Sequence, residues 1–188
     1  ELGVAQADKL RAVADTAGLA KRLGAFPPVT GNSIELIHDY DELIGRLIDD
    51  IDAARSAVRL LIYIFADDAV GRSVVSALGR AVRRGVRCEV LLDPVGSRPW
   101  IRGTIEALRQ EGVSTRQALR FHWLRARTRR DMRNHRKLFV IDGVIGYAGS
   151  QNIVAKDFSP GIINRELVAR VTGPIVSALE AVIVMDWC

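Results

Sequence analysis

The sequence has 188 residues, of which 48% are hydrophobic and 26% are charged, which excludes a disordered chain and suits one domain with a sizeable core. The net charge of +5 favours anionic partners such as phospholipid headgroups, nucleic acid or phosphorylated small molecules, and charge alone does not choose among them. No apolar run reaches the roughly 18 residues that a membrane-spanning helix needs.

Residues 1–32 are predicted to lie outside the compact domain. Small apolar residues with scattered charges over 2–23 indicate a short amphipathic helix. Residues 24–32 contain Pro27-Pro28 and Gly31-Asn32, which are typical of a linker or loop. We therefore predict an N-terminal helix and linker at 1–32 and a folded domain at 33–188.

Strands and helices alternate over the next part of the chain. We predict strands at 33–38, 58–65 and 86–92, helices at 39–55, 70–84 and 99–110, and a short edge strand from Val113. The strand at 58–65 is almost continuously apolar, as in a parallel strand that is buried on both faces. The strand–helix–strand order then predicts a parallel pair with a right-handed crossover. Cys88 lies in the third strand and is interpreted as an inert buried thiol.

Aromatic and basic side chains gather in the segment 118–133. Phe121 and Trp123 precede a cluster of arginines that includes Arg129, Arg130 and Arg133. Guanidinium groups bind phosphates in a bidentate manner, and aromatic rings lie at headgroup depth in membranes. We interpret the segment as a binding site for anionic headgroups or substrate phosphates, with a solvated loop as the alternative.

The clearest motif is a predicted hairpin over 134–152. An apolar run from 138 to 141 reads as a buried strand, Asp142-Gly143 is a strong hairpin turn signal, and 144–148 is the return strand. His135 and Lys137 precede the hairpin, and Ser150 and Asn152 follow it. Because antiparallel strands bring these ends together, the four side chains are expected to face one small volume.

The last elements complete the predicted fold. Residues 164–171 read as another strand, and Thr172 is expected to cap a final helix with Pro174 near its start. Alternating strands and helices with one hairpin predict an α/β fold. We expect a mixed, largely parallel β-sheet flanked by helices on both faces.

The polar residues around the hairpin suit phosphodiester chemistry. A neutral imidazole at His135 can attack phosphorus and form a covalent phosphohistidine. Lys137 would neutralise phosphate charge, and Asn152, with Ser150 as a further donor, would donate hydrogen bonds as charge builds in the transition state. Glu166, on the following strand, is the best candidate to orient the imidazole, although it could instead pair with Arg165 or Arg170 at the surface. The sequence offers no carboxylate cage for a metal, so no metal or other cofactor is expected.

The spacing H-x-K-x4-D-x6-G-S-x-N in 135–152 resembles the HKD signature of the phospholipase D superfamily, and every position of the signature is filled. In that superfamily an acidic residue at about the distance of Glu166 holds the motif histidine, which supports the orienting role. We assign Asp142, at the hairpin turn, to structural support. Gly149 is interpreted as a position where the backbone passes close to the phosphate.

A longer resemblance points to one branch of the superfamily. Ile62-Tyr63-Ile64-Phe65, the run 92–97 and the run 165–174 look like the first catalytic half of bacterial cardiolipin synthases, and the likeness covers about residues 30–188. It implies that 33–188 is a phospholipase D-like catalytic domain with one HKD motif. The implied enzyme is a phosphatidyltransferase that acts on a phosphatidylglycerol-like lipid. The implied location is the surface of the bacterial cytoplasmic membrane.

The sequence departs from the family pattern because it contains one HKD motif, whereas the family builds one site from two. Either two copies dimerise or the chain is the first half of a longer enzyme, and the end at Trp187-Cys188 favours the second idea. One alternative is a homodimeric phosphodiesterase that cuts nucleic acid, which the basic charge would suit. Another is a partner-dependent half without activity of its own.

Overall fold

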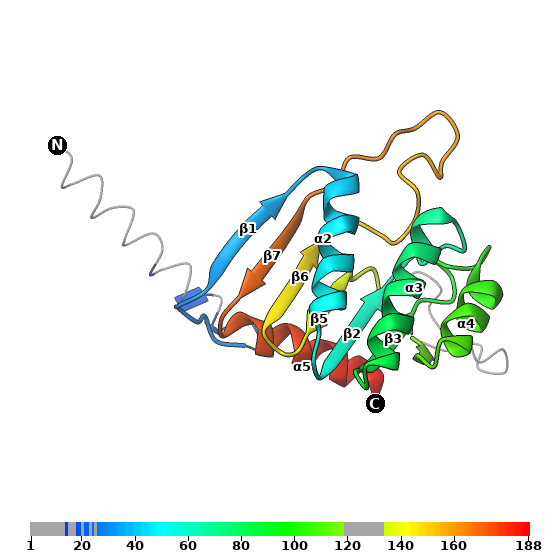
Figure 1. The fold of residues 1–188 in the computed structure, drawn as a ribbon. Coiled ribbons are helices and arrows are strands. Elements are labelled where there is room, and N and C mark those ends of the chain that lie inside the picture. The colour runs from blue at the N-terminus through cyan, green and yellow to red at the C-terminus, as the bar shows by residue number, and fades with distance from the viewer. Residues whose placement is uncertain (1–13, 15–17, 20, 23, 25, 119–133) are drawn as a thin grey trace, which may run out of the picture.

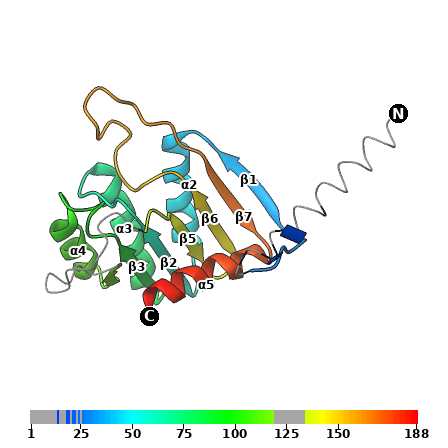
Figure 2. The ribbon, with the colours of Figure 1, turned by 180° about the vertical axis from the view of Figure 1, so that it is seen from behind.

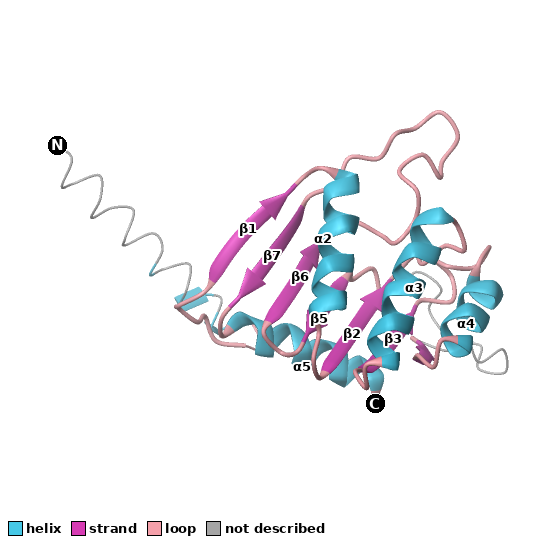
Figure 3. Cartoon of the chain, viewed as in Figure 1, coloured by secondary structure: helices cyan, strands magenta, loops and turns pink. Residues whose placement is uncertain are grey.

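The computed structural model describes residues 26–118 and 134–188, together with positions 14, 18, 19, 21, 22 and 24. The predicted N-terminal helix falls almost entirely outside this part of the chain. The described elements are coloured along the chain in Figure 1 and by type in Figure 3. They are β1 (Ser33–Ile37), α2 (Tyr40–Ala53), β2 (Ala57–Ile62), α3 (Ala69–Arg83), β3 (Arg87–Leu92), α4 (Ile101–Gln110), β4 (Ser114–Gln117), β5 (Leu138–Ile141), β6 (Ile145–Gly149), β7 (Val168–Thr172) and α5 (Ile175–Trp187).

The strands form a mixed seven-stranded sheet in the order β1-β7-β6-β5-β2-β3-β4. The mixed sheet confirms the predicted fold class, but the expectation of a largely parallel sheet is wrong. Only β2–β3 and β3–β4 are parallel, and the other four neighbouring pairs are antiparallel. The reason is that crossover helices connect only β2, β3 and β4, whereas the hairpin and the strands beside it reverse direction at each step.

Helices cover both faces of the sheet, as predicted. Helices α2, α3 and α4 lie on one face, and α5 crosses the other, which the two opposite views show (Figures 1 and 2). Successive residues of β2 serve the two layers in turn, because side chains alternate along a strand. Leu60 and Ile62 pack with the first group of helices, and Leu61 packs with α5. The sheet is therefore buried on both sides at β2.

Local sequence signals account for several element ends. The side chain of Asp39 accepts a hydrogen bond from the Glu42 amide at 2.8 Å and begins α2, and Asp68 does the same for α3 with the Gly71 amide. Gly85 follows α3 with a φ of 88°, a conformation that favours glycine.

Two predictions about the last elements are wrong. Strand β7 begins at Val168 rather than near 164, so Glu166 precedes the strand. The predicted capping residue Thr172 is the last residue of β7, and the N-cap of α5 is Pro174 without a side-chain bond. The side chain of Asn32 satisfies the first helical amide instead, because its Oδ1 accepts from the Ile175 amide at 2.8 Å. That partner is too far away in sequence for local pattern analysis to find.

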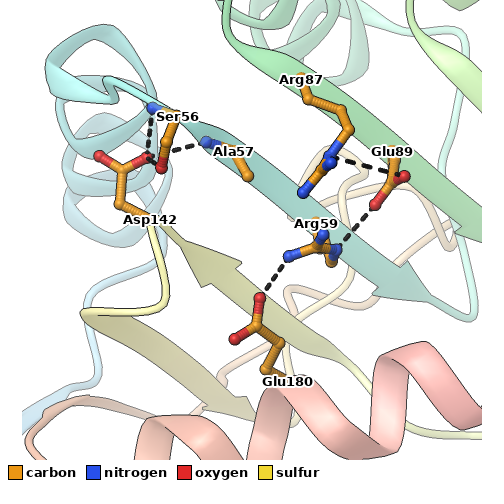
Figure 4. A network of polar contacts seen from close by, with 7 residues as sticks. All are labelled: Ser56, Ala57, Arg59, Arg87, Glu89, Asp142 and Glu180. Atoms are coloured by element: carbon orange, nitrogen blue, oxygen red, sulfur yellow. Dashed lines mark hydrogen bonds and ion pairs between the residues drawn. The ribbon is translucent and has the colours of Figure 1, made fainter.

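Ion pairs join the layers on both faces. On the α5 side, the Arg59 guanidinium of β2 lies between Glu89 of β3 and Glu180 of α5 (Figure 4). On the α2 side, Arg170 of β7 donates to Asp50 of α2 at 2.8 and 3.0 Å. These partly buried pairs fix the helices against the strands, because removal of either partner leaves a charge without compensation.

Candidate active site

The predicted site residues come together at one side of the sheet, along the line where neighbouring strands begin or end. We call this line an edge of the sheet. Strand β5 is antiparallel to both β2 and β6, with Leu138 opposite Leu61 and Ala148. Strand β7 begins beside the end of β6, with Val168 opposite Gly149. The start of β5, the ends of β2 and β6 and the start of β7 therefore share one edge. His135, Lys137, Ser150, Asn152 and Glu166 all belong to the segments that meet there.

His135 is exposed at this edge and contacts Tyr63 and Lys137. The centroids of the imidazole and the Tyr63 ring lie 4.4 Å apart in an edge-to-face arrangement with an interplanar angle of 62°. The Lys137 ammonium lies 3.1 Å from Nδ1 of the imidazole and donates to the His135 carbonyl at 2.9 Å. The imidazole thus has an aromatic support on one side and a fixed positive charge nearby.

These neighbours favour the neutral form of the imidazole. Burial and the charge of Lys137 lower the pKa of His135 from its ordinary value of 6.5, although Asp93 opposes the shift. A histidine with a lowered pKa is neutral at neutral pH, and only the neutral form carries a lone pair for attack on phosphorus.

Lys137 is unusual because it is only 5% exposed. Burial lowers the pKa of its ammonium, and the charge of Glu166 opposes that effect. The ammonium also lies 5.4 Å from the centre of the Tyr63 ring, within the range of a cation–π contact. A lysine held in this way presents its charge to a phosphate with little freedom to lose on binding.

Ser150 and Asn152 lie at the end of β6 and bind main-chain groups. The Ser150 hydroxyl accepts from the Leu167 amide at 3.0 Å and donates to the Leu167 carbonyl at 3.3 Å, which closes the base of the loop between β6 and β7. The Oδ1 of Asn152 accepts from the Ile64 amide at 3.0 Å. Because its oxygen is engaged, Asn152 has its amide N–H groups available to donate to a phosphoryl oxygen.

Glu166 lies just before β7 at the same edge. The described hydrogen bonds of His135 do not include Glu166, so the orienting contact stays a prediction. Its charge nevertheless reaches the site, because it raises the pKa of Lys137 and contributes to the raised pKa of Tyr40, which burial dominates. The alternative pairing with Arg170 is not observed, since that guanidinium binds Asp50.

Asp142 lies at the opposite edge, where the hairpin turns with a φ of 55° at this residue. Its carboxylate accepts from the amides of Ser56 and Ala57 and from the Ser56 hydroxyl at 2.8 to 2.9 Å (Figure 4). It also accepts from the Arg55 amide at 2.8 Å. Burial raises the pKa of Asp142, but these hydrogen bonds outweigh it and hold the pKa below the ordinary value. Asp142 thus ties the hairpin to the link between α2 and β2.

The fold explains why residue 149 is a glycine. A Cβ at this position would lie 2.4 Å from the Leu167 carbonyl oxygen and 2.7 Å from the Val168 Cα. The absence of a side chain therefore lets β6 approach β7, and contact with a phosphate at Gly149 stays a prediction.

Sequence reasoning missed Tyr63 and Asp93 as members of the site. Asp93 follows β3 and is 1% exposed; its Oδ1 accepts from the Val95 and Gly96 amides at 2.8 and 3.1 Å. Its Oδ2 is buried without a hydrogen-bond partner in the described part of the chain. Both residues directly follow parallel strands, and ligands often bind at the carboxyl ends of such strands, which is the signal that could have identified them.

Several predictions fall outside the described residues. Arg129, Arg130 and Arg133 lie there, together with Phe121 and Trp123. Where the structure does describe the chain, no group of three His, Cys, Asp or Glu side chains is placed to hold a metal ion. Within the same residues, none of the helices has the length and apolar character to span a bilayer. Cys88 is buried, and burial raises the pKa of its thiol to about 11, which supports the prediction of an inert thiol.

Comparisons with known proteins identify the family of this chain. A family model described as "Cardiolipin synthase, PLD-like domain" matches residues 47–187. The cardiolipin synthase A of Pectobacterium carotovorum is 36% identical over 175 residues, and that of Citrobacter koseri is 34% identical over 175 residues. Each alignment covers 90% of this chain, and the chain spans about a third of the relatives' length, 36% in both.

Two solved structures share the fold. NUC, a phospholipase D family member from Salmonella typhimurium, has a TM-score of 0.62 at 19% identity, with 84% of this chain and 95% of that chain covered. NucT from Helicobacter pylori has a TM-score of 0.66 at 19% identity, with 84% and 96% covered. The family model, the curated relatives and the shared fold confirm the resemblance seen in the sequence. The chain belongs to the phospholipase D-like domain family of the cardiolipin synthases.

Proposed function

We propose that this domain catalyses phosphatidyl transfer of the phospholipase D type on an anionic phospholipid, with His135 as the nucleophile. The observation that carries the proposal is the exposed imidazole of His135 beside the buried ammonium of Lys137. The imidazole supplies a neutral nucleophile, and the ammonium supplies the fixed positive charge that a phosphodiester needs. The chain belongs to a family whose description names cardiolipin synthase, and this membership supports a lipid substrate.

The proposed reaction has two displacements at phosphorus. A neutral ring nitrogen of His135 attacks the phosphorus of a phosphatidylglycerol-like lipid, the P–O bond to the headgroup breaks, and glycerol leaves with a proton from a general acid. The hydroxyl of an acceptor then gives a proton to the same group and attacks, which breaks the P–N bond and frees His135. Lys137 balances the phosphate charge, and Asn152 donates hydrogen bonds to its oxygens. Ser150 joins as a further donor when its hydroxyl turns from the Leu167 carbonyl to the phosphate.

The general acid is proposed to come from a second HKD motif. The alignments cover 95% and 96% of the chains of NUC and NucT, so each of those chains consists of little more than one domain of this fold. Such one-domain chains support completion of the site by a second copy of this chain. The relatives are much longer than this chain, which supports completion by a second half. In the second case the isolated domain is a partner-dependent half, unable to protonate a poor leaving group such as glycerol.

The domain is further proposed to work at a membrane surface. A phospholipid presents its phosphate at headgroup depth, and the net charge of +5 favours an anionic bilayer. In this proposal Arg129, Arg130 and Arg133 contact headgroups. Cleavage of nucleic acid by a homodimer is the second candidate, because the same charge would suit a polyanion.

The test uses two substrates that make different demands on the site. Bis-p-nitrophenyl phosphate releases a phenolate that leaves without protonation, so the first displacement needs only the nucleophile and the positive charge. Water then attacks phosphorus, which breaks the P–N bond and frees His135. Phosphatidylglycerol in vesicles needs the complete site, and a DNA oligonucleotide tests the nuclease. We expect His135→Asn to reduce aryl phosphodiester turnover by about a thousandfold or more and to abolish a covalent phosphoryl adduct in the 134–137 peptide.

His38 provides a matched control because it is exposed and follows β1, which lies three strands away from β5 in the sheet. His38→Asn should leave both turnover and adduct within about twofold of the original protein. Turnover that persists in folded His135→Asn would remove the nucleophile assignment. Cleavage of DNA in preference to phosphatidylglycerol would instead select the nuclease.

A further inference from the structure

Asp186, near the end of α5, contacts the residues on both sides of His135. Its Oδ2 accepts a hydrogen bond from Asn134 Nδ2 at 2.5 Å and another from Arg136 Nη1 at 3.0 Å. The second contact is also an ion pair, with the Asp186 side chain 27% exposed. One carboxylate oxygen therefore binds both chain neighbours of the proposed nucleophile.

These contacts add to the support that Lys137 gives by donating to the His135 carbonyl. Residues 134–137 belong to no helix or strand, so ladder hydrogen bonds do not hold them. The Arg136 amide donates to Asn134 Oδ1 at 3.3 Å, which links the two neighbours to each other. Side-chain contacts must then fix the main chain at His135, and Asp186 provides two of them.

The end of α5 is held in place by packing and by contacts with β4. Ile183, one turn earlier, is 1% exposed and packs against the sheet. The guanidinium of Arg116, on β4, lies 5.1 Å from the Trp187 ring centre and donates to the Trp187 carbonyl. A carboxylate on such an end has a defined position, so its two hydrogen bonds can transmit that position to residues 134 and 136.

We infer that Asp186 is a positioning residue for the proposed phosphoryl transfer. It holds the side chains of both chain neighbours of His135, which restrains the main chain between them, so that the imidazole stays beside Lys137 and aligned for attack. The inference rests on the proposed function for its catalytic meaning and on the described contacts for its structural meaning. Misplacement of a reacting group by about 1 Å can slow an enzyme by about a hundredfold, so the support has a measurable value.

The first experiment compares Asp186→Ala, Asp186→Asn and Arg116→Ala with bis-p-nitrophenyl phosphate as the substrate. We expect Asp186→Ala to lower kcat about 10- to 100-fold with KM within about twofold, because binding groups remain while alignment is lost. Asp186→Asn keeps an oxygen that can accept from both donors, so it should recover part of the rate. Arg116→Ala removes only contacts to Trp187 and leaves Ile183 packed and both hydrogen bonds of Asp186 in place, so its kcat should stay within about threefold.

A double-mutant cycle measures the coupling between Asp186 and Asn134, which is one of its two partners. Asn134→Ala should lower kcat in the original protein but have little further effect in Asp186→Ala, because its partner is already gone. The inference is overturned if folded Asp186→Ala keeps full kcat, or if Arg116→Ala loses as much as Asp186→Ala does.

A second measurement does not depend on activity. The NMR order parameter of the His135 amide should be near the rigid value of about 0.85 in the original protein and in Arg116→Ala. In Asp186→Ala it should fall below about 0.6. An unchanged order parameter would overturn the inference even if the original protein turned over no substrate, whereas a lowered value with an inactive protein would sustain the positioning role and refute the proposed function alone.

Discussion

At the residue scale, His135 and Lys137 form an asymmetric pair, because the imidazole is exposed and the ammonium is buried. The ammonium favours the neutral form of the imidazole, which is the form that attack on phosphorus needs. The charge of Lys137 opposes protonation of His135, so the imidazole stays neutral to lower pH than an isolated histidine. The pair can therefore combine a nucleophile with a phosphate-binding charge at neutral pH.

Replacement of Lys137 should affect both the binding of phosphate charge and the pKa of His135, and the two effects can be measured separately. We expect Lys137→Met to lower kcat/KM for bis-p-nitrophenyl phosphate by about 10²- to 10³-fold, because a donor to the charged phosphoryl oxygens is lost. The acidic limb of the pH–rate profile, which lies below His135's ordinary value of 6.5, should move upward. The sign follows because one of the two causes that lower this pKa is removed, while burial remains. A limb that moves to lower pH would contradict the pair.

Glu166 provides a second test at this scale. If it orients the imidazole during the reaction, Glu166→Gln should slow adduct formation about 10- to 100-fold, less than His135→Asn does. Removal of its charge also takes away the effect that raises the pKa of Lys137. Adduct formation is measured by rapid mixing and mass spectrometry. A rate equal to that of the original protein would exclude Glu166 from the site.

At the element scale, the hairpin β5–β6 carries different duties at its two ends. The open end presents His135, Lys137, Ser150 and Asn152, and the turn presents Asp142 to the link between α2 and β2. The motif thus includes a residue that lies one strand length from the reaction. Such a residue supports the site through the stability of the hairpin rather than by contact with substrate.

Asp142→Ala should therefore affect stability more than chemistry. Loss of an acceptor for three amides and a hydroxyl is expected to lower the free energy of unfolding by about 2 to 3 kcal/mol. The pKa of Asp142 is lowered in the folded state, so its contribution is present above the pKa of the unfolded state and is lost as pH falls through the folded pKa. Urea unfolding at several pH values should show a weaker acid dependence in the variant.

The same hairpin turn contains the control. Val144 is 60% exposed, and Val144→Ser should change stability by less than about 0.5 kcal/mol. Folded Asp142→Ala should keep kcat within about threefold, because the carboxylate lies at the other edge of the sheet. A large loss of kcat in the folded variant would give Asp142 a role in catalysis.

Sequence patterns predicted the elements whose signals are local. Helices α2 and α3 begin close to the predicted starts at 39 and 70, where the caps Asp39 and Asp68 bind amides within a few residues. The turn at Asp142-Gly143 also appears where expected. Patterns did not predict the start of β7, which is set by pairing with β1 and β6. The same limit explains why the sheet was expected to be largely parallel.

The candidate site was predictable to a similar degree. The four hairpin residues were found because they have fixed spacing on one hairpin. Tyr63 and Asp93 were missed because they follow β2 and β3, far from the motif in sequence. Their approach to His135 depends on the antiparallel pairing of β5 with β2, which no local pattern states.

At the scale of the whole molecule, the sheet presents one HKD motif at one edge. A single imidazole can be the nucleophile or the acid in one displacement, but it cannot be both. The reaction proposed for phosphatidylglycerol therefore needs a second motif, whereas an activated aryl phosphodiester does not. A comparison of the turnover rates of the two substrates therefore tests whether a second motif completes the site.

We expect aryl phosphodiester turnover per chain to be independent of protein concentration. Phosphatidylglycerol turnover per chain should instead rise over the concentration range where light scattering shows the mass change from 20.7 kDa to twice that value. This dependence would mean that two copies complete the site. A chain that stays monomeric should form the His135 adduct with the aryl phosphodiester yet leave phosphatidylglycerol intact, because the acid belongs to another half. Turnover of phosphatidylglycerol by a strict monomer would contradict the need for a second motif, and the search for the acid would then return to Glu166 and Asp93 on this chain.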